Sequence, residues 1–142
     1  LRHGRMPWGM NNDIIGFEAL PDHIRMNIRD GIALQRDGDA WIRYRVALVE
    51  PDGDSWHVVD DACVDHWIDA DNPLLDPDAP LPEPVGRDPK PGDLIRLTRR
   101  DDPAITDITR YKGLPDGPYD GWDTTDGPYL TLDWTLDGVI EE

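Results

Sequence analysis

Residues 40–59 read AWIRYRVALVE, PDGD and SWHVV in succession, and this stretch decides the fold class. Apolar residues alternate with polar ones through 40–50, with Arg43 and Arg45 on one face, which is the period of a β-strand. The Asp52-Gly53 pair that follows predicts a tight turn, because Asp and Gly tolerate the positive φ angles of hairpin turns. We therefore expect a long strand, a turn and a second strand that returns alongside the first.

Asp-Gly pairs extend this hairpin pattern along the chain. Such pairs between alternating or β-branched runs are a strong short-range hairpin signal. The seven pairs lie at 30–31, 37–38, 52–53, 116–117, 120–121, 126–127 and 137–138. Before the first pair, the alternation of Ile24, Met26 and Ile28 favours a strand, and the alternative is a short helix started by Pro21.

Three further runs read as strands. They are residues 94–98, 105–111 and 130–136, and the last of them places Leu130, Leu132, Trp134 and Leu136 on one face. The Pro91-Gly92-Asp93 entry to the first run resembles strand entries in small SH3-like and OB-like barrels, over about ten residues. We predict a mainly β fold, a hairpin-rich small barrel or sandwich of about six to eight strands.

Two segments interrupt the strand pattern. Within 60–70, Cys63 and Val64 recur at Trp67 and Ile68 with helical spacing, so one short helix is predicted there, with Asp60 or Asp61 as its N-cap. Residues 72–91 carry seven prolines and predict a connector or surface arm without regular structure. We expect an N-terminal extension at 1–12 and a single domain at 13–142, within which this arm could separate two subdomains.

Charge is distributed unevenly. The net charge is -16, and residues 1–50 are balanced, so the excess acidity lies entirely in 51–142. A polyanion such as DNA would be repelled, which argues against direct binding of nucleic acid. There are 25 Asp and five Glu, a bias that disfavours a mostly helical fold and suits either a saline medium or a GC-rich genome.

The compartment is constrained only weakly. No apolar run has the length of a membrane span and no secretory signal is recognised, so we expect a soluble protein, intracellular or associated with a virus particle, without a membrane partner. The single cysteine, Cys63, cannot form an internal disulfide, and its apolar neighbours suggest a small buried side chain.

Metal binding has one weak set of candidates. Asp61, Asp65 and Asp69 would share one face of the predicted helix, and oxygen ligands suit Ca²⁺. No EF-hand pattern accompanies them, and a solvated helix face is the simpler interpretation. His57 and His66 together with carboxylates could form a transition-metal site, but no tight motif supports it. We therefore predict no cofactor, with Ca²⁺ as the only alternative.

Catalysis receives no support from motifs. The sequence contains no G-x-S-x-G elbow, P-loop, H-E-x-x-H or G-x-G-x-x-G pattern, and thirty carboxylates make any chosen pair uninformative. We name no catalytic residue and predict that the protein is not an enzyme.

The C-terminal tail combines aromatic and acidic residues. Exposed aromatic rings beside carboxylates can stack on a sugar or act as hot spots against a basic protein. The alternative is that they cover a turn or belong to the core. The candidate partner-binding residues are Tyr119, Asp120, Trp122, Asp123 and Asp126.

These observations favour a non-catalytic acidic protein that acts in interaction or assembly. It would bind a protein partner, basic in character, or associate with itself. Small acidic, turn-rich chains without catalytic motifs resemble structural or accessory proteins of viruses, including phages. The first alternative is a DNA-mimic or immunity-type inhibitor of a basic nuclease or nucleic-acid-binding protein. The others are a Ca²⁺-binding or carbohydrate-binding module and an uncharacterised enzyme.

Overall fold

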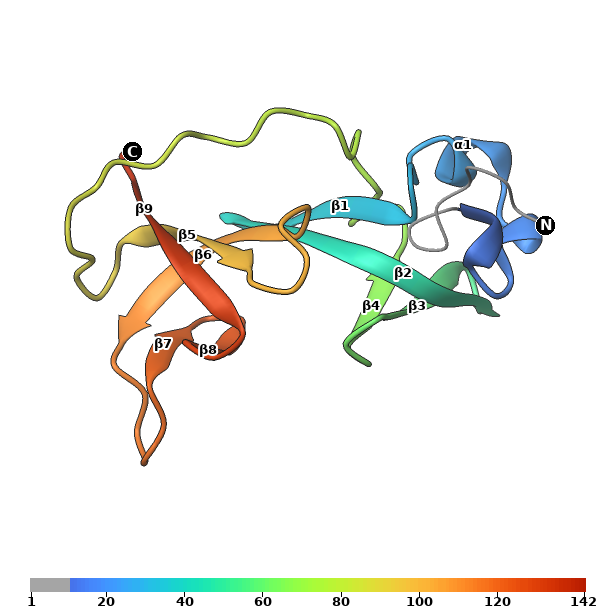
Figure 1. Ribbon diagram of the computed structural model, residues 1–142. Coiled ribbons are helices and arrows are strands. Elements are labelled where there is room, and N and C mark those ends of the chain that lie inside the picture. Colours follow the sequence, from blue (N-terminus) through green and yellow to red (C-terminus); the bar gives the residue numbers. More distant parts are fainter. Residues whose placement is uncertain (1–10) are drawn as a thin grey trace, which may run out of the picture. The chain divides into compact units, whose positions relative to one another are not determined.

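The computed structural model describes residues 11–142 and is mainly β, as predicted (Figure 1). Residues 1–10 of the expected N-terminal extension lie outside the described residues. Close contacts divide the chain into two units. Unit 1 contains the described residues up to 36 together with 43–79, and unit 2 contains 37–42 and 80–142.

Unit 1 places three short helical turns before an antiparallel sheet. The helical elements are η1 (Asn11–Asp13), η2 (Phe17–Ala19) and α1 (Asp22–Arg25). The strands are β1 (Ile32–Asp37), β2 (Ala40–Asp52), β3 (Ser55–Asp60) and β4 (Asp65–Ile68). Strand β2 pairs with β3 around the predicted turn, and β3 pairs with β4. The first residues of β2 belong to unit 2.

Unit 2 is built around one central strand. Its strands are β5 (Leu94–Arg99), β6 (Thr106–Gly113), β7 (Gly121–Thr124), β8 (Gly127–Leu130) and β9 (Trp134–Ile140). Strand β6 pairs with β5, with β7 and, through Ile108, with Trp41 of β2. Strand β5 also pairs with β9, and β7 forms a hairpin with β8. The path of paired strands ends at β4 and β9, so the sheet is not a closed barrel.

Each unit has its own apolar core. In unit 2, Ile95, Leu97, Tyr111, Tyr129 and Val139 are buried together, and Trp122, Trp134 and Leu136 pack against them. In unit 1 the alternation of β2 and β3 buries one face of each strand. The buried apolar residues there include Leu20, Ile24, Ile28, Ala33, Leu34, Tyr44, Val46, Val49, Val58, Ile68 and Leu74.

The helix predicted within 60–70 is wrong. Residues 61–64 form a turn, and Asp65–Ile68 is strand β4. The Asp60 carboxylate accepts hydrogen bonds from the backbone N–H groups of Ala62 and Val64, which closes a turn rather than capping a helix. Cys63 adopts a positive φ of 64° in this turn and is exposed, so the expected burial of its side chain is also wrong.

The strand favoured around Ile24 is wrong as well, and the alternative is correct. Pro21 precedes helix α1, and its carbonyl accepts hydrogen bonds from the N–H groups of Ile24 and Arg25. Leu20, Ile24 and Ile28 are all buried, although only Ile24 belongs to the four-residue helix. A short helix therefore forms in place of the predicted strand.

The predicted strand at 130–136 is split in two. Strand β8 ends at Leu130, a turn covers 131–133, and β9 begins at Trp134. Leu132 is consequently 86% exposed rather than buried with its expected neighbours. The alternation of apolar and polar residues gives no sign of this turn, in which the backbone N–H of Asp133 donates to the carbonyl of Leu130.

The proline-rich stretch 72–91 contains no strand or helix, as predicted, and Figure 1 draws it as a long connection. Isolated bridges hold it at two places, Leu75 to Leu34 in unit 1 and Val85 to Val139 in unit 2. No helix within the described residues 11–142 has the length and apolar character needed to cross a membrane.

Candidate functional site

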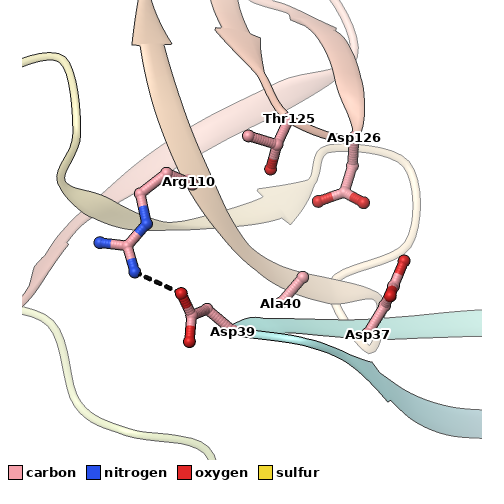
Figure 2. A pocket seen from close by; sticks show the side chains of 6 residues that line it. All are labelled: Asp37, Asp39, Ala40, Arg110, Thr125 and Asp126. Carbon is pink, nitrogen blue, oxygen red and sulfur yellow. Dashed lines mark hydrogen bonds and ion pairs between the residues drawn. The ribbon is translucent and has the colours of Figure 1, made fainter.

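A pocket of about 300 Å³ opens in unit 2 between two hairpin turns and strand β6 (Figure 2). Gly38 and Asp39 make the turn between β1 and β2, and Thr125 and Asp126 make the turn between β7 and β8. Gly38 has a φ of 62°, which an Asp-Gly pair supplies at little cost. The residues that line the pocket are Asp37, Asp39, Ala40, Arg110, Thr125 and Asp126.

Arg110 forms one wall of the pocket and is held firmly. Its Nη2 lies 2.6 Å from Oδ2 of Asp39, and its Nη1 lies 3.0 Å from Oε2 of Glu142. The same Nη1 donates to the carbonyl of Gly92 at 2.7 Å. These hydrogen bonds to Glu142 and Asp39 raise the pKa of Arg110 above its usual value, so the guanidinium stays charged. Its charge is already matched within the protein.

The turn of Thr125 and Asp126 forms another wall, and hydrogen bonds with threonine hydroxyl groups hold it in place. The Oγ1 of Thr109 donates to Oδ2 of Asp126, and the backbone N–H of Asp126 donates to Oγ1 of Thr124 at 3.0 Å. Thr109 and Thr124 are fully buried, which fixes the position of the turn. The carboxylate of Asp126 is thereby oriented while its residue remains exposed.

A buried tyrosine lies behind this wall. The hydroxyl of Tyr129 donates to Oδ2 of Asp107 at 2.8 Å. Burial raises the pKa of Tyr129, and the negative charges of Asp107 and Asp126 raise it further, so the phenol stays protonated. Tyr129 acts here as a structural donor and offers no nucleophile to the pocket.

The pocket carries net negative charge. Asp37, Asp39 and Asp126 contribute three carboxylates against the one guanidinium of Arg110. Within the described residues, the Asp37 carboxylate has neither a hydrogen-bond nor an ion-pair partner. Figure 2 shows Asp126 above Asp37 on the right of the view and Arg110 on the left. A cationic group entering the pocket would find carboxylate acceptors there, whereas an anion would be repelled.

Of the predicted partner-binding residues, the structure brings only Asp126 into this pocket. Tyr119 is 42% exposed and Asp120 is exposed, both on the approach to β7. Trp122 is half-buried against the core of unit 2, and Asp123 lies 3.8 Å from Nζ of Lys112. The partner-binding role of these five residues stays a prediction.

The candidates Asp61, Asp65 and Asp69 do not share a helix face, because no helix forms there. Asp65 accepts from Nε2 of His57 at 2.8 Å. Asp69 accepts from the backbone N–H groups of residues 71 and 72, and Asp61 lies exposed in the turn before β4. Within residues 11–142 no group of three or more His, Cys, Asp or Glu side chains is arranged to hold a metal ion. The Ca²⁺ site stays a prediction.

Sequence reasoning missed Asp37, Asp39 and Arg110 as members of one site. The Asp37-Gly38 pair was recognised as a turn signal, but a turn signal does not say which other turn it will face. Arg110 lies on β6, far from both turns in the sequence. The pairing of Trp41 with Ile108 and the ion pair of Asp39 with Arg110 bring the first turn to the side of β6.

Comparison with protein families, with curated proteins and with solved structures finds no match to this chain.

Proposed function

We propose that this chain is a non-catalytic interaction protein that binds a basic protein partner through the acidic pocket of unit 2. The observation that carries the proposal is the pocket itself, which is lined by the braced carboxylate of Asp126 and by that of Asp37, which has no partner among the described residues 11–142. The wider setting that we propose is an accessory or assembly role, of the kind that structural proteins of viruses perform.

The chemistry of the pocket favours a guanidinium or ammonium group as the part of the partner that enters. Its volume is at the lower end of the range for small-ligand sites, which suits one long cationic side chain. Arg110 is already neutralised by Asp39 and Glu142, so it does not cancel the attraction of the other two carboxylates. A buried, activated nucleophile is not among the residues that line the pocket.

The test uses a short capped peptide that contains a single arginine as the probe. Amide chemical shifts of Thr125 and Asp126 would follow its binding by NMR. Replacing either carboxylate, as Asp37→Asn or Asp126→Asn, should weaken binding by about two- to fivefold, the range expected for one partly solvated ion pair. Added salt should weaken binding further, because screening reduces the attraction.

Asp116→Asn is the matched control. Asp116 is also exposed in unit 2 but does not line the pocket, and the substitution changes the net charge equally. It should leave the affinity for the peptide unchanged. Equal weakening by all three substitutions would show that the peptide responds only to overall charge, and the proposal would then fail.

A further inference from the structure

A second surface lies on one face of the sheet in unit 1. Glu50 of β2 pairs across the strands with His57 of β3, and His57 pairs with Trp67 of β4. Directly paired residues on neighbouring antiparallel strands project to the same face. These three side chains therefore form a row across the sheet. The opposite face of the same strands buries Val49, Val58 and Ile68.

Trp67 is exposed and yet held in place. The residue is 46% exposed, although Trp is among the residues that proteins normally bury over most of their surface. Its Nε1–H donates to Oδ2 of Asp52 at 3.0 Å. The ring of His57 stacks against it, with a centroid separation of 5.0 Å and an interplanar angle of 30°. An aromatic ring that is fixed before binding loses little conformational entropy when a partner covers it.

The same contacts hold His57. Its Nδ1 lies 2.8 Å from Oε1 of Glu50, and its Nε2 lies 2.8 Å from Oδ1 of Asp65. Two carboxylate acceptors are satisfied together only when both ring nitrogens carry hydrogen, which is the imidazolium form. The carboxylates of Glu50, Asp52 and Asp65 then outnumber this cation by two charges. The row remains negative even with His57 protonated.

We propose that the row of Glu50, His57 and Trp67, extended by Asp52 and Asp65, which are hydrogen-bonded to it, is a docking surface for an arginine-bearing segment of a protein partner. The carboxylates of Glu50 and Asp65 are more than half exposed and retain lone pairs for further donors. A guanidinium can stack on an indole and donate to a neighbouring carboxylate at the same time, which ammonium groups do less well. Charge complementarity and the prepared indole select arginine as the residue that docks.

This surface is independent of the pocket in unit 2, because the two are made of different residues in different units. The inference goes beyond the proposed function and does not rest on it. Substitutions that disable one site leave the other intact, so failure of either can be recognised separately.

The experiment compares two capped peptides of alternating glycine and a basic residue, one with arginine and one with lysine. Binding is followed in the full chain by the backbone amide resonances of His57 and Asp65, which every variant retains, and by the indole N–H resonance wherever Trp67 is present. We expect the arginine peptide to bind more tightly, and Trp67→Leu to weaken it by at least about fivefold, a moderate hot-spot loss. Asp52→Asn and Glu50→Gln should each weaken it by about two- to fivefold.

Glu18→Gln is the matched control in the same unit. The Glu18 side chain is 89% exposed and is not part of the row, and the change in net charge is the same. Circular dichroism melting checks that each variant folds. If Trp67→Leu does not fold, Asp52→Asn tests the surface in its place. Asp37→Asn in unit 2 should leave the Trp67 resonance and its response unchanged.

Three results would overturn the inference. In the first, Trp67→Leu binds the arginine peptide as well as the unsubstituted chain does. In the second, Glu18→Gln weakens binding as much as Asp52→Asn does, so that only overall charge matters. In the third, the chain forms a dimer that Trp67→Leu abolishes, so that a second copy covers the row instead of an arginine segment.

Discussion

Replacement of Asp60 by alanine is the sharpest test of how unit 1 is held together. Asp60 is 7% exposed, and its carboxylate is the common acceptor of three donors. Oδ1 accepts from the backbone N–H groups of Ala62 at 2.8 Å and Val64 at 3.0 Å, and Oδ2 lies 2.8 Å from Nε2 of His66. The ring of His66 stacks in turn on Tyr44, with centroids 3.8 Å apart. Asp60→Ala removes all three bonds at once.

The expected cost follows from these partners. A hydrogen bond contributes about 0.5–1.5 kcal/mol net, and one to a charged group about 1.5–3 kcal/mol. Ala62 and Val64 are exposed, so water can replace part of the hydrogen bonding that their N–H groups lose. His66 is mostly buried, so water replaces its lost hydrogen bond less well. We therefore expect Asp60→Ala to lower the free energy of unfolding by about 2–4 kcal/mol. Asp60→Asn keeps an acceptor for the turn and should cost less.

Urea unfolding measured by circular dichroism gives these free energies, and native-state hydrogen exchange of β3 and β4 assigns the loss to unit 1. Asp71→Ala is the control, because Asp71 is exposed and only its backbone N–H bonds to Asp69. It should change stability by less than about 0.5 kcal/mol. A loss below about 1 kcal/mol for Asp60→Ala would refute the role assigned to this carboxylate.

The pH dependence of the Asp60 contribution has a defined sign. Burial raises the pKa of this carboxyl, but the hydrogen bonds from His66, Val64 and Ala62 outweigh burial and lower the pKa below 3.8. A group with a lowered folded pKa stabilises the fold above its unfolded pKa and loses that contribution as the pH falls through the folded value. The stability difference between the unsubstituted chain and Asp60→Asn should therefore shrink below about pH 4.

Two further predictions concern other parts of the structure. Gly138→Ala should lower the free energy of unfolding by about 2 kcal/mol or more, and with it the urea midpoint, because φ is +149° there and a Cβ would overlap the backbone carbonyl of Val85; an unchanged midpoint would contradict this packing. His57 should titrate by NMR above its ordinary pKa of 6.5, because it is hydrogen-bonded to Glu50 and Asp65. Its stabilising contribution should be full below pH 6.5 and decline as the pH rises through the folded pKa, and a measured pKa at or below 6.5 would exclude the paired arrangement.

The local sequence was sufficient to predict strands and hairpins where the two-residue alternation of a strand was followed by a turn signal. The alternation through 40–50 and the Asp52-Gly53 turn predicted β2, its turn and β3, and the runs at 94–98 and 105–111 predicted β5 and β6. A strand face and a hairpin turn are set by residues that are neighbours in the chain, so their pattern is readable without the rest of the protein. The mainly β class follows from the same evidence.

Local sequence failed where a distant partner chose between two structures. Residues 65–68 carry a helical spacing, but pairing with β3 and the Asp60 turn make them a strand. Asp-Gly at 137–138 resembles a turn, yet Gly138 lies inside β9, where it passes close to the backbone of Val85. Backbone hydrogen bonds to a neighbouring strand outweigh the modest propensities that single residues express.

The candidate sites depend entirely on contacts between segments that are distant in the sequence. Asp126 was predicted as an acidic residue beside aromatic ones, but Asp37, which lines the same pocket, lies 89 positions earlier in the sequence. Trp67 was expected in a helix and instead lies exposed on a sheet face beside His57. The sequence alone specified strands, turns and an excess of negative charge. Strand pairing decided which charges face one another, because register between distant segments is a property of the folded chain and not of any local run.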